Sequence, residues 1–191
     1  MRCHGRSEKN TAKLTLNTLV DETCQLLLQL GVEKPVLIGH SMGGMVALEY
    51  ALRDSSQVKA LVLAEAHTHL DTTASLLGPG VLDARTPAEI AQEIQGCMNR
   101  GEASVCKELF DSLLAFDARA QVGNLACPVL CLWGDRYGDI SPGQWPQILE
   151  AFGYARLPNL VFYSIPNSHH FMMLEQPQET LQAIQDFLSN L

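Results

Sequence analysis

The sequence contains no apolar run of the ~20 residues that a membrane-spanning helix needs. Its first twenty residues also lack the apolar core of a secretory signal, so we expect a cytoplasmic protein without a membrane span. Basic residues are scarce: 13 Lys and Arg stand against 21 Asp and Glu, which gives a net charge of −8. Because nucleic acids and anionic membrane surfaces are bound through clustered positive charge, neither is an expected partner.

None of the six cysteines forms a Cys-x-x-Cys pair, and we expect buried, reduced thiols at Cys127 and Cys131, which flank the strand-like "CPVLC". Internal repeats, low-complexity tracts and long linkers are absent as well. A chain of 191 residues is long enough for one domain with a sizeable core, so we expect a single domain over residues 1–191.

Hydrophobic periodicity divides the chain into alternating strands and helices. The expected strands cover residues 35–39, 58–64, 128–133 and 160–165, and the expected helices cover residues 15–30, 42–53, 87–95, 103–116 and 178–191. This alternation, with strands that are apolar on both faces, predicts the α/β class: a mainly parallel sheet flanked by helices on both sides. Active sites of such sheets gather at the carboxyl ends of the strands, so the residues after each strand deserve inspection.

The first expected strand runs into "GHSMGG", a Gly-x-Ser-x-Gly pattern between a strand and a helix. This context predicts a sharp turn that exposes the Ser41 hydroxyl as a nucleophile. Gly39 and Gly43 are explained if side chains at these positions would collide at the turn. Gly44 is explained if the helix packs closely on the strand. The backbone N–H of Met42 would then point at a substrate carbonyl and stabilise an oxyanion.

A serine hydroxyl needs a base, and an acid must orient that base. His169 and His170 follow the last strand in "IPNSHHFMMLEQP", and we favour His170 as the base. Asp135 and Asp139 follow the third strand in "GDRYGDISP". The order serine, aspartate, histidine along the chain is the one expected for this arrangement.

Together, "HGRSEK", "LVDETCQLLLQLGVEKPVLIGHSMGGMVALEYA", "PVLCLWGD" and "SHHFMMLEQP" resemble the α/β-hydrolase-fold superfamily, the class of serine esterases and lipases, over nearly the whole chain. The resemblance implies a triad of Ser41, Asp139 and His170 that needs no cofactor. It also implies a helical cap over about residues 67–124, with "TASLLGPGVL" near the acyl or alcohol site.

The sequence departs from the family pattern at the acid and at the base. The family usually carries its acid where Tyr137 stands, and Asp139 lies two residues further on. Asp135 is therefore a second candidate, and Glu65 is a third, since some relatives take the acid from the end of that strand. His169 replaces a residue that is often glycine, and it would either compete for the serine or face solvent.

The sequence also begins later than the family pattern, in which earlier strands and a second oxyanion loop precede "HGRS". The resemblance then implies that the strand at Val36 lies at an apolar sheet edge, which favours self-association or aggregation. It further implies an oxyanion hole that lacks one donor, a change that costs about 10²–10³ in rate.

Three functions follow as hypotheses. The first is a serine hydrolase that cleaves a small ester, thioester or lactone through an acyl-enzyme, with other chemistry of the fold (C–C bond hydrolysis or a lyase) as an alternative. The second is a catalytically impaired form that acts through protein interaction. The third is a metal hydrolase based on "HTHLD" at residues 67–71, but Thr72 stands where such sites carry another histidine, so we expect no metal.

Overall fold

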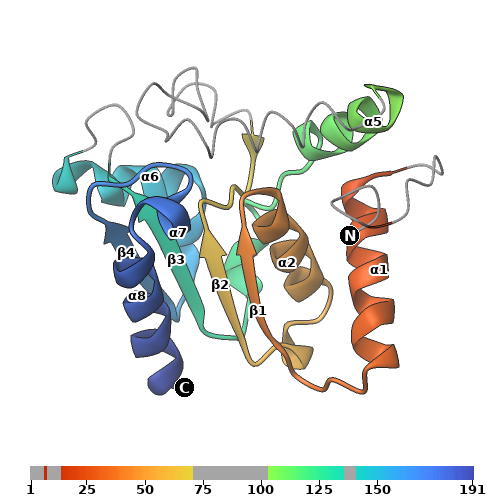
Figure 1. The fold of residues 1–191 in the computed structure, drawn as a ribbon, viewed down its shortest axis with the longest axis horizontal. Coiled ribbons are helices and arrows are strands. Elements are labelled where there is room, and N and C mark those ends of the chain that lie inside the picture. Colours follow the sequence, from red (N-terminus) through yellow and green to blue (C-terminus); the bar gives the residue numbers. More distant parts are fainter. Residues whose placement is uncertain (1–6, 8–13, 71–102, 136–140) are drawn as a thin grey trace.

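The computed structural model describes residue 7 and residues 14–70, 103–135 and 141–191 (Figure 1). Its centre is a parallel sheet of strands in the order β1-β2-β3-β4, so neighbours in space are also consecutive strands of the chain. The strands are β1 (Val36–His40), β2 (Ala60–Ala64), β3 (Val129–Gly134) and β4 (Leu160–Ile165). The predicted parallel α/β architecture is confirmed.

Helices connect the strands and cover the sheet (Figure 1). They are α1 (Leu16–Gln29), α2 (Met42–Arg53), α5 (Ala103–Leu114), α6 (Trp145–Ala151), α7 (Met172–Glu175) and α8 (Pro177–Ser189). Short 3-10 turns lie at Ser55–Gln57, Val122–Asn124, Pro142–Gln144 and Tyr154–Arg156. Thr15 caps α1 through a capping box with Thr18, and Gly31 ends it with a φ of 63°, which favours glycine.

The two faces of the sheet have separate apolar cores. On one face, alternate residues of β2 and β3, such as Leu63 and Cys131, pack against α2 and α6. On the other face, Val62 and Leu132 pack against α8 through Phe187. A third cluster joins α1, α2 and α5, so α1 lies outside α2 instead of on the sheet.

The central and outer strands differ in burial. Every residue of β2 and β3 is buried, as predicted for strands that are apolar on both faces. β4 alternates between half-buried and exposed residues, and Ile38 in the middle of β1 is 57% exposed. The prediction of strands buried on both faces is therefore wrong for these two strands, which are the outer strands of the sheet in the described part of the chain.

The expected helices at residues 15–30, 42–53, 103–116 and 178–191 match α1, α2, α5 and α8 within two residues at each end. The helix expected at residues 87–95 lies outside the described residues, as does most of the expected cap. The short helices α6 and α7 were not predicted from the sequence. Cys127 and Cys131 are buried free thiols, as expected.

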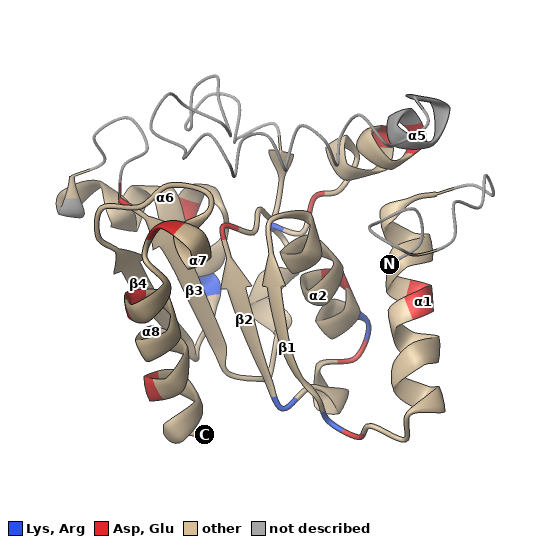
Figure 2. Ribbon diagram, viewed as in Figure 1, with Lys and Arg blue, Asp and Glu red and all other residues tan. Residues whose placement is uncertain are grey.

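In the described part of the chain, no helix is both long and apolar enough to cross a membrane. Figure 2 shows the described Lys and Arg residues scattered over the fold; Lys34 and Lys59 lie just before β1 and β2 begin.

Candidate active site

Ser41 occupies the turn between β1 and α2, as the Gly-x-Ser-x-Gly pattern predicts. Its backbone has φ 53° and ψ −123°, a combination that is strained for a residue with a side chain. The Ser41 N–H donates a 2.9 Å hydrogen bond to the carbonyl of Ala64 at the end of β2, which fixes the turn to the neighbouring strand. The Ser41 side chain makes no capping bond to α2, so its hydroxyl is left for other chemistry.

Close packing explains two of the three glycines around Ser41. A Cβ at Gly39 would lie 2.4 Å from the carbonyl oxygen of Gly43, and a Cβ at Gly44 would lie 2.3 Å from the Cβ of Ala66. Both predictions are confirmed. The prediction for Gly43 is wrong, because a Cβ there would meet nothing within 4 Å.

Met42 is the first residue of α2. The first N–H groups of a helix have no partner within the helix, and they lie at the positive end of its dipole. The backbone N–H of Met42 is thus available as the oxyanion donor that the sequence predicts, which stays a prediction without a bound substrate.

His170 is buried in the loop that follows β4, and the carboxylate of Glu65 lies beside it. Glu65 Oε2 lies 3.7 Å from His170 Nδ1, which is an ion-pair distance but longer than a hydrogen bond. Glu65 is fully buried just after β2 and adopts a φ of 49°. Its Oε1 accepts a 2.6 Å hydrogen bond from the N–H of Gly134, which fixes the carboxylate between β2 and β3.

Burial lowers the pKa of His170 from 6.5 to about 4, and the nearby negative charge of Glu175 opposes part of that shift by raising it. His170 is therefore neutral at neutral pH, which is the form that can accept a proton. With Nδ1 facing Glu65, the remaining ring nitrogen, Nε2, is the atom available to a nucleophile.

The loop that carries His170 is held by side chains on both sides. Asp135 accepts a 2.8 Å hydrogen bond from the Asn167 N–H, so this second candidate for the acid serves as a support of the loop. Glu175 Oε2 accepts from the His169 N–H at 3.1 Å and lies 3.0 Å from His169 Nδ1. The expectation that His169 faces solvent is wrong, because its ring is largely buried against Glu175; whether it competes for the serine stays a prediction.

Backbone strain concentrates at this site. Of the four described non-glycine residues with positive φ, Ser41, Glu65 and Asn167 lie at the turn, the carboxylate and the histidine loop. Strained residues persist where the surrounding structure holds them, and they cluster at functional sites. The positive φ at Glu65 and Asn167 could not be predicted from the sequence.

Two predictions depend on residues that the structure does not describe. Asp139 lies outside the described residues, and its role as the acid stays a prediction. For the "HTHLD" motif, the His67 ring packs against Trp133 and Phe152, while His69 Nδ1 lies 3.9 Å from Asp117. No group of three or more His, Cys, Asp or Glu in the described ranges is arranged to hold a metal ion.

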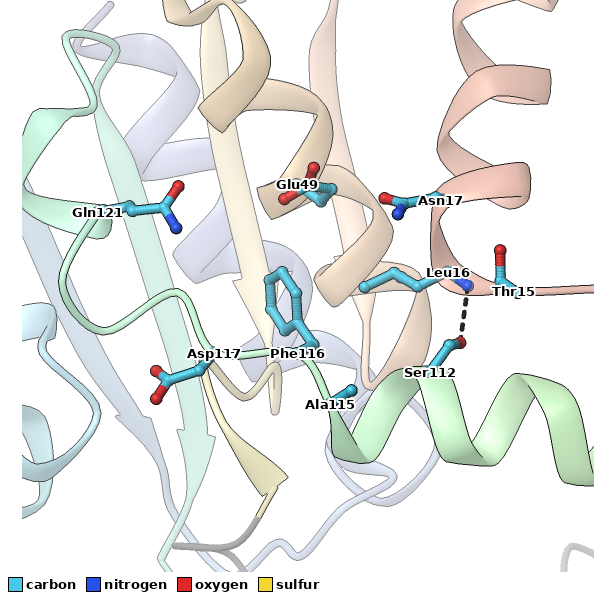
Figure 3. Close-up of a pocket in the computed structure, with 9 residues that line it drawn as sticks. All are labelled: Thr15, Leu16, Asn17, Glu49, Ser112, Ala115, Phe116, Asp117 and Gln121. Atoms are coloured by element: carbon cyan, nitrogen blue, oxygen red, sulfur yellow. Dashed lines mark hydrogen bonds between the residues drawn. The ribbon is translucent and has the colours of Figure 1, made fainter.

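A cavity of about 550 Å³ lies elsewhere, between α1, α2 and the segment that follows α5 (Figure 3). Glu49, Asn17 and Gln121 point into it with Phe116 between them. At its edge the Ser112 hydroxyl accepts a 2.9 Å hydrogen bond from the Leu16 N–H. Its lining includes neither Ser41 nor His170, so this cavity is separate from the candidate active site.

Comparisons with known proteins agree with the fold and the turn. The profile of the family described as alpha/beta hydrolase fold matches residues 1–93. An sn-1-specific diacylglycerol lipase (ABHD11) of Danio rerio is 28% identical over 98% of this chain and 67% of its own length. A pimeloyl-[acyl-carrier protein] methyl ester esterase of Chromobacterium violaceum is 25% identical over 80% of this chain and 69% of its own length.

Solved structures show the same fold. Est816, described as an N-acyl homoserine lactone degrading enzyme, superposes with a TM-score of 0.72 at 20% identity, covering 97% of this chain and 80% of its own. The chain spans about two thirds of the length of the two curated relatives.

Proposed function

Because the chain belongs to the α/β-hydrolase superfamily of enzymes, we propose that it is a serine hydrolase that cleaves a small ester, thioester or lactone. The proposal rests on the strained turn that holds Ser41 and on the buried, neutral His170 beside a carboxylate; His40, the residue before Ser41, contacts His170 directly. The relatives are described as acting on a diacylglycerol, a methyl ester and an N-acyl homoserine lactone, and each of these compounds contains an ester bond.

In the proposed reaction, the Ser41 hydroxyl attacks the substrate carbonyl and its proton passes to His170 Nε2. The Met42 N–H stabilises the resulting oxyanion. Collapse of the tetrahedral intermediate forms an acyl-Ser41 bond and breaks the bond to the leaving group, which takes the proton from His170. Water, deprotonated by His170, then attacks the acyl group; His170 returns that proton to the Ser41 oxygen as the acid is released and Ser41 is freed.

The acid that orients His170 has two candidates. Asp139 follows β3, where the order of the triad along the chain places the acid. Glu65 is supported by its 3.7 Å approach to Nδ1 and by its fixed, buried carboxylate. Either residue would hold the Nδ1-protonated tautomer and stabilise the imidazolium that forms during the reaction.

Fluorophosphonate labelling tests the proposal, because the probe phosphonylates an activated serine. We expect the wild type to be labelled at Ser41 and to hydrolyse a short-chain nitrophenyl ester. Ser41→Ala should lose both activities, and His170→Ala should lose at least 10³-fold in the labelling rate. A folded wild type that neither labels nor hydrolyses such esters would contradict the proposal.

The exposed edge of the sheet supports self-association as a second role. In the described part of the chain β1 pairs with β2 alone, and Ile38 in its middle is 57% exposed. Unpaired strand edges bind other strands, and a second copy of this chain presents the same edge. Light scattering should show a dimer that Ile38→Lys makes monomeric, whereas a wild type that is monomeric at all concentrations contradicts this role.

A further inference from the structure

His40, the residue directly before Ser41, makes a hydrogen bond that joins the serine turn to the histidine loop. Its Nε2 lies 2.6 Å from the backbone carbonyl oxygen of His170. Its ring also contacts the rings of His170 and Phe171, with centroid distances of 4.6 and 5.4 Å. His40 is the last residue of β1, so this contact crosses from one edge of the sheet to the loop that follows the other edge.

The sheet by itself leaves these two parts of the site far apart. Neighbouring strands are about 4.8 Å apart, so β1 and β4 are separated by about 14 Å across β2 and β3. The loop after β4 must therefore reach over two strands before His170 can meet Ser41. A base acts only when its nitrogen lies about 2.6–3.2 Å from the hydroxyl, so the reach of this loop has to be set closely.

Asp135 and Glu175 anchor the loop from its own side of the sheet, through Asn167 and His169. His40 is the group that reaches the loop from the strand of the nucleophile. We propose that His40 is a positioning residue, which sets the distance between Ser41 and His170 by donating its Nε2 proton to the His170 carbonyl.

The chemistry of this bond fixes the state of the His40 ring. A carbonyl oxygen only accepts hydrogen bonds, so Nε2 carries the proton and Nδ1 does not. Burial, together with the neighbouring His170, holds the pKa of His40 at about 4, although the bond to the carbonyl raises it somewhat. A neutral ring is required here, because a second positive charge would oppose the imidazolium that His170 becomes during the proposed reaction.

The test rests on the proposed function for its kinetic part and uses a matched pair of variants. His40→Gln keeps an N–H donor at a similar reach, whereas His40→Met has a similar size and no donor. We expect His40→Met to lower kcat for a nitrophenyl ester by about 10–100-fold with little change in KM, in line with the cost of a small misplacement of the reacting groups. His40→Gln should recover most of that loss.

A purely structural role would lower the thermal stability of both variants without lowering kcat selectively over KM. Equal kinetics in His40→Gln, His40→Met and wild type would overturn the proposal. Should His40→Met fail to fold, His40→Gln is compared with His40→Ala instead. If His40→Gln loses as much kcat as His40→Ala, donation by His40 is refuted.

A second readout does not depend on activity. Nitrogen-15 NMR of the imidazole rings in the full chain should show His40 as the Nε2–H tautomer at pH 7. The Nδ1–H tautomer would overturn the positioning role even in an active enzyme. An inactive wild type with the Nε2–H tautomer would refute the proposed function and leave the His40 bond supported.

Discussion

Acid should destabilise this protein well above the pH at which carboxylates titrate, and His67 allows the effect to be measured one group at a time. His67 lies just after β2 and is 5% exposed, with its ring against Trp133 and Phe152. Its Nδ1 is buried and has no hydrogen-bond partner among the described residues. Burial, with smaller contributions from the nearby His170 and His40, lowers the pKa of His67 to about 3.

The sign of the effect follows from these values. A folded-state pKa below the unfolded value of 6.5 means that the unfolded chain binds more protons between pH 3 and 6.5. The stabilising contribution is complete above pH 6.5 and is lost as the pH falls below it. Between pH 8 and pH 5, His67 alone should reduce the free energy of unfolding by about 2 kcal/mol.

His40 and His170, each with a pKa lowered to about 4, should act in the same direction and add a similar amount each. The sum, about 6 kcal/mol, is comparable to the whole stability of an ordinary domain. We therefore expect the wild type to be much less stable at pH 5 than at pH 8.

Urea denaturation followed by circular dichroism at pH 8, 6.5 and 5 provides the assay, with His67→Leu as the matched variant. At pH 8 this variant should be as stable as the wild type or more so, because it removes a buried polar atom without a partner. At pH 5 it should exceed the wild type by a further ~2 kcal/mol. If both proteins lose the same free energy between pH 8 and pH 5, the reasoning about His67 is refuted.

Three further predictions concern the site. The fluorophosphonate labelling rate should stay level from pH 8 to about 5.5, where the protein is still folded, because burial lowers the pKa of His170 to about 4; a fall with a midpoint near 6.5 would contradict this. Glu65→Gln keeps the bond to the backbone and should lower kcat by up to ~10⁴, whereas Asp139→Asn should cost less if Glu65 is the acid; the reverse ranking would assign the acid to Asp139. Gly44→Ala should destabilise the fold by about 1–3 kcal/mol in thermal denaturation, because its Cβ would meet a neighbouring Cβ at 2.3 Å; the matched Gly43→Ala has open space and should be neutral, and equal stability of the two would contradict the packing account.

The fold could be predicted from local pattern because the buried strands β2 and β3 are apolar throughout and the helices between them have clear periodicity. The turn at Ser41 could be predicted because Gly-x-Ser-x-Gly between a strand and a helix is typical of a nucleophile turn. Two short helices were missed. α6 begins with Trp145 and Pro146 and α7 has four residues, so neither is long enough to show a helical period.

The contacts of the base could not be read from the sequence. Glu65 follows a buried strand in sequence, but its approach to His170 depends on the left-handed backbone at Glu65 and on the pairing of β2 with β3. Asp135 was a reasonable acid by its position after β3, yet its carboxylate is occupied by the Asn167 N–H. The support that Glu175 gives to His169 was also missed, although a glutamate six residues after a histidine in "HHFMMLE" offered a weak signal.

The central claim, that Ser41 is a nucleophile activated by His170, is tested most directly by trapping the acyl-enzyme. Wild type mixed with a slowly hydrolysed nitrophenyl ester and quenched in acid should gain the mass of one acyl group, located on Ser41 by peptide mapping. Ser41→Ala should gain none, and His170→Ala should acylate at least 10³-fold more slowly. An acyl group found on another residue, or ester turnover that persists in Ser41→Ala, would contradict the account.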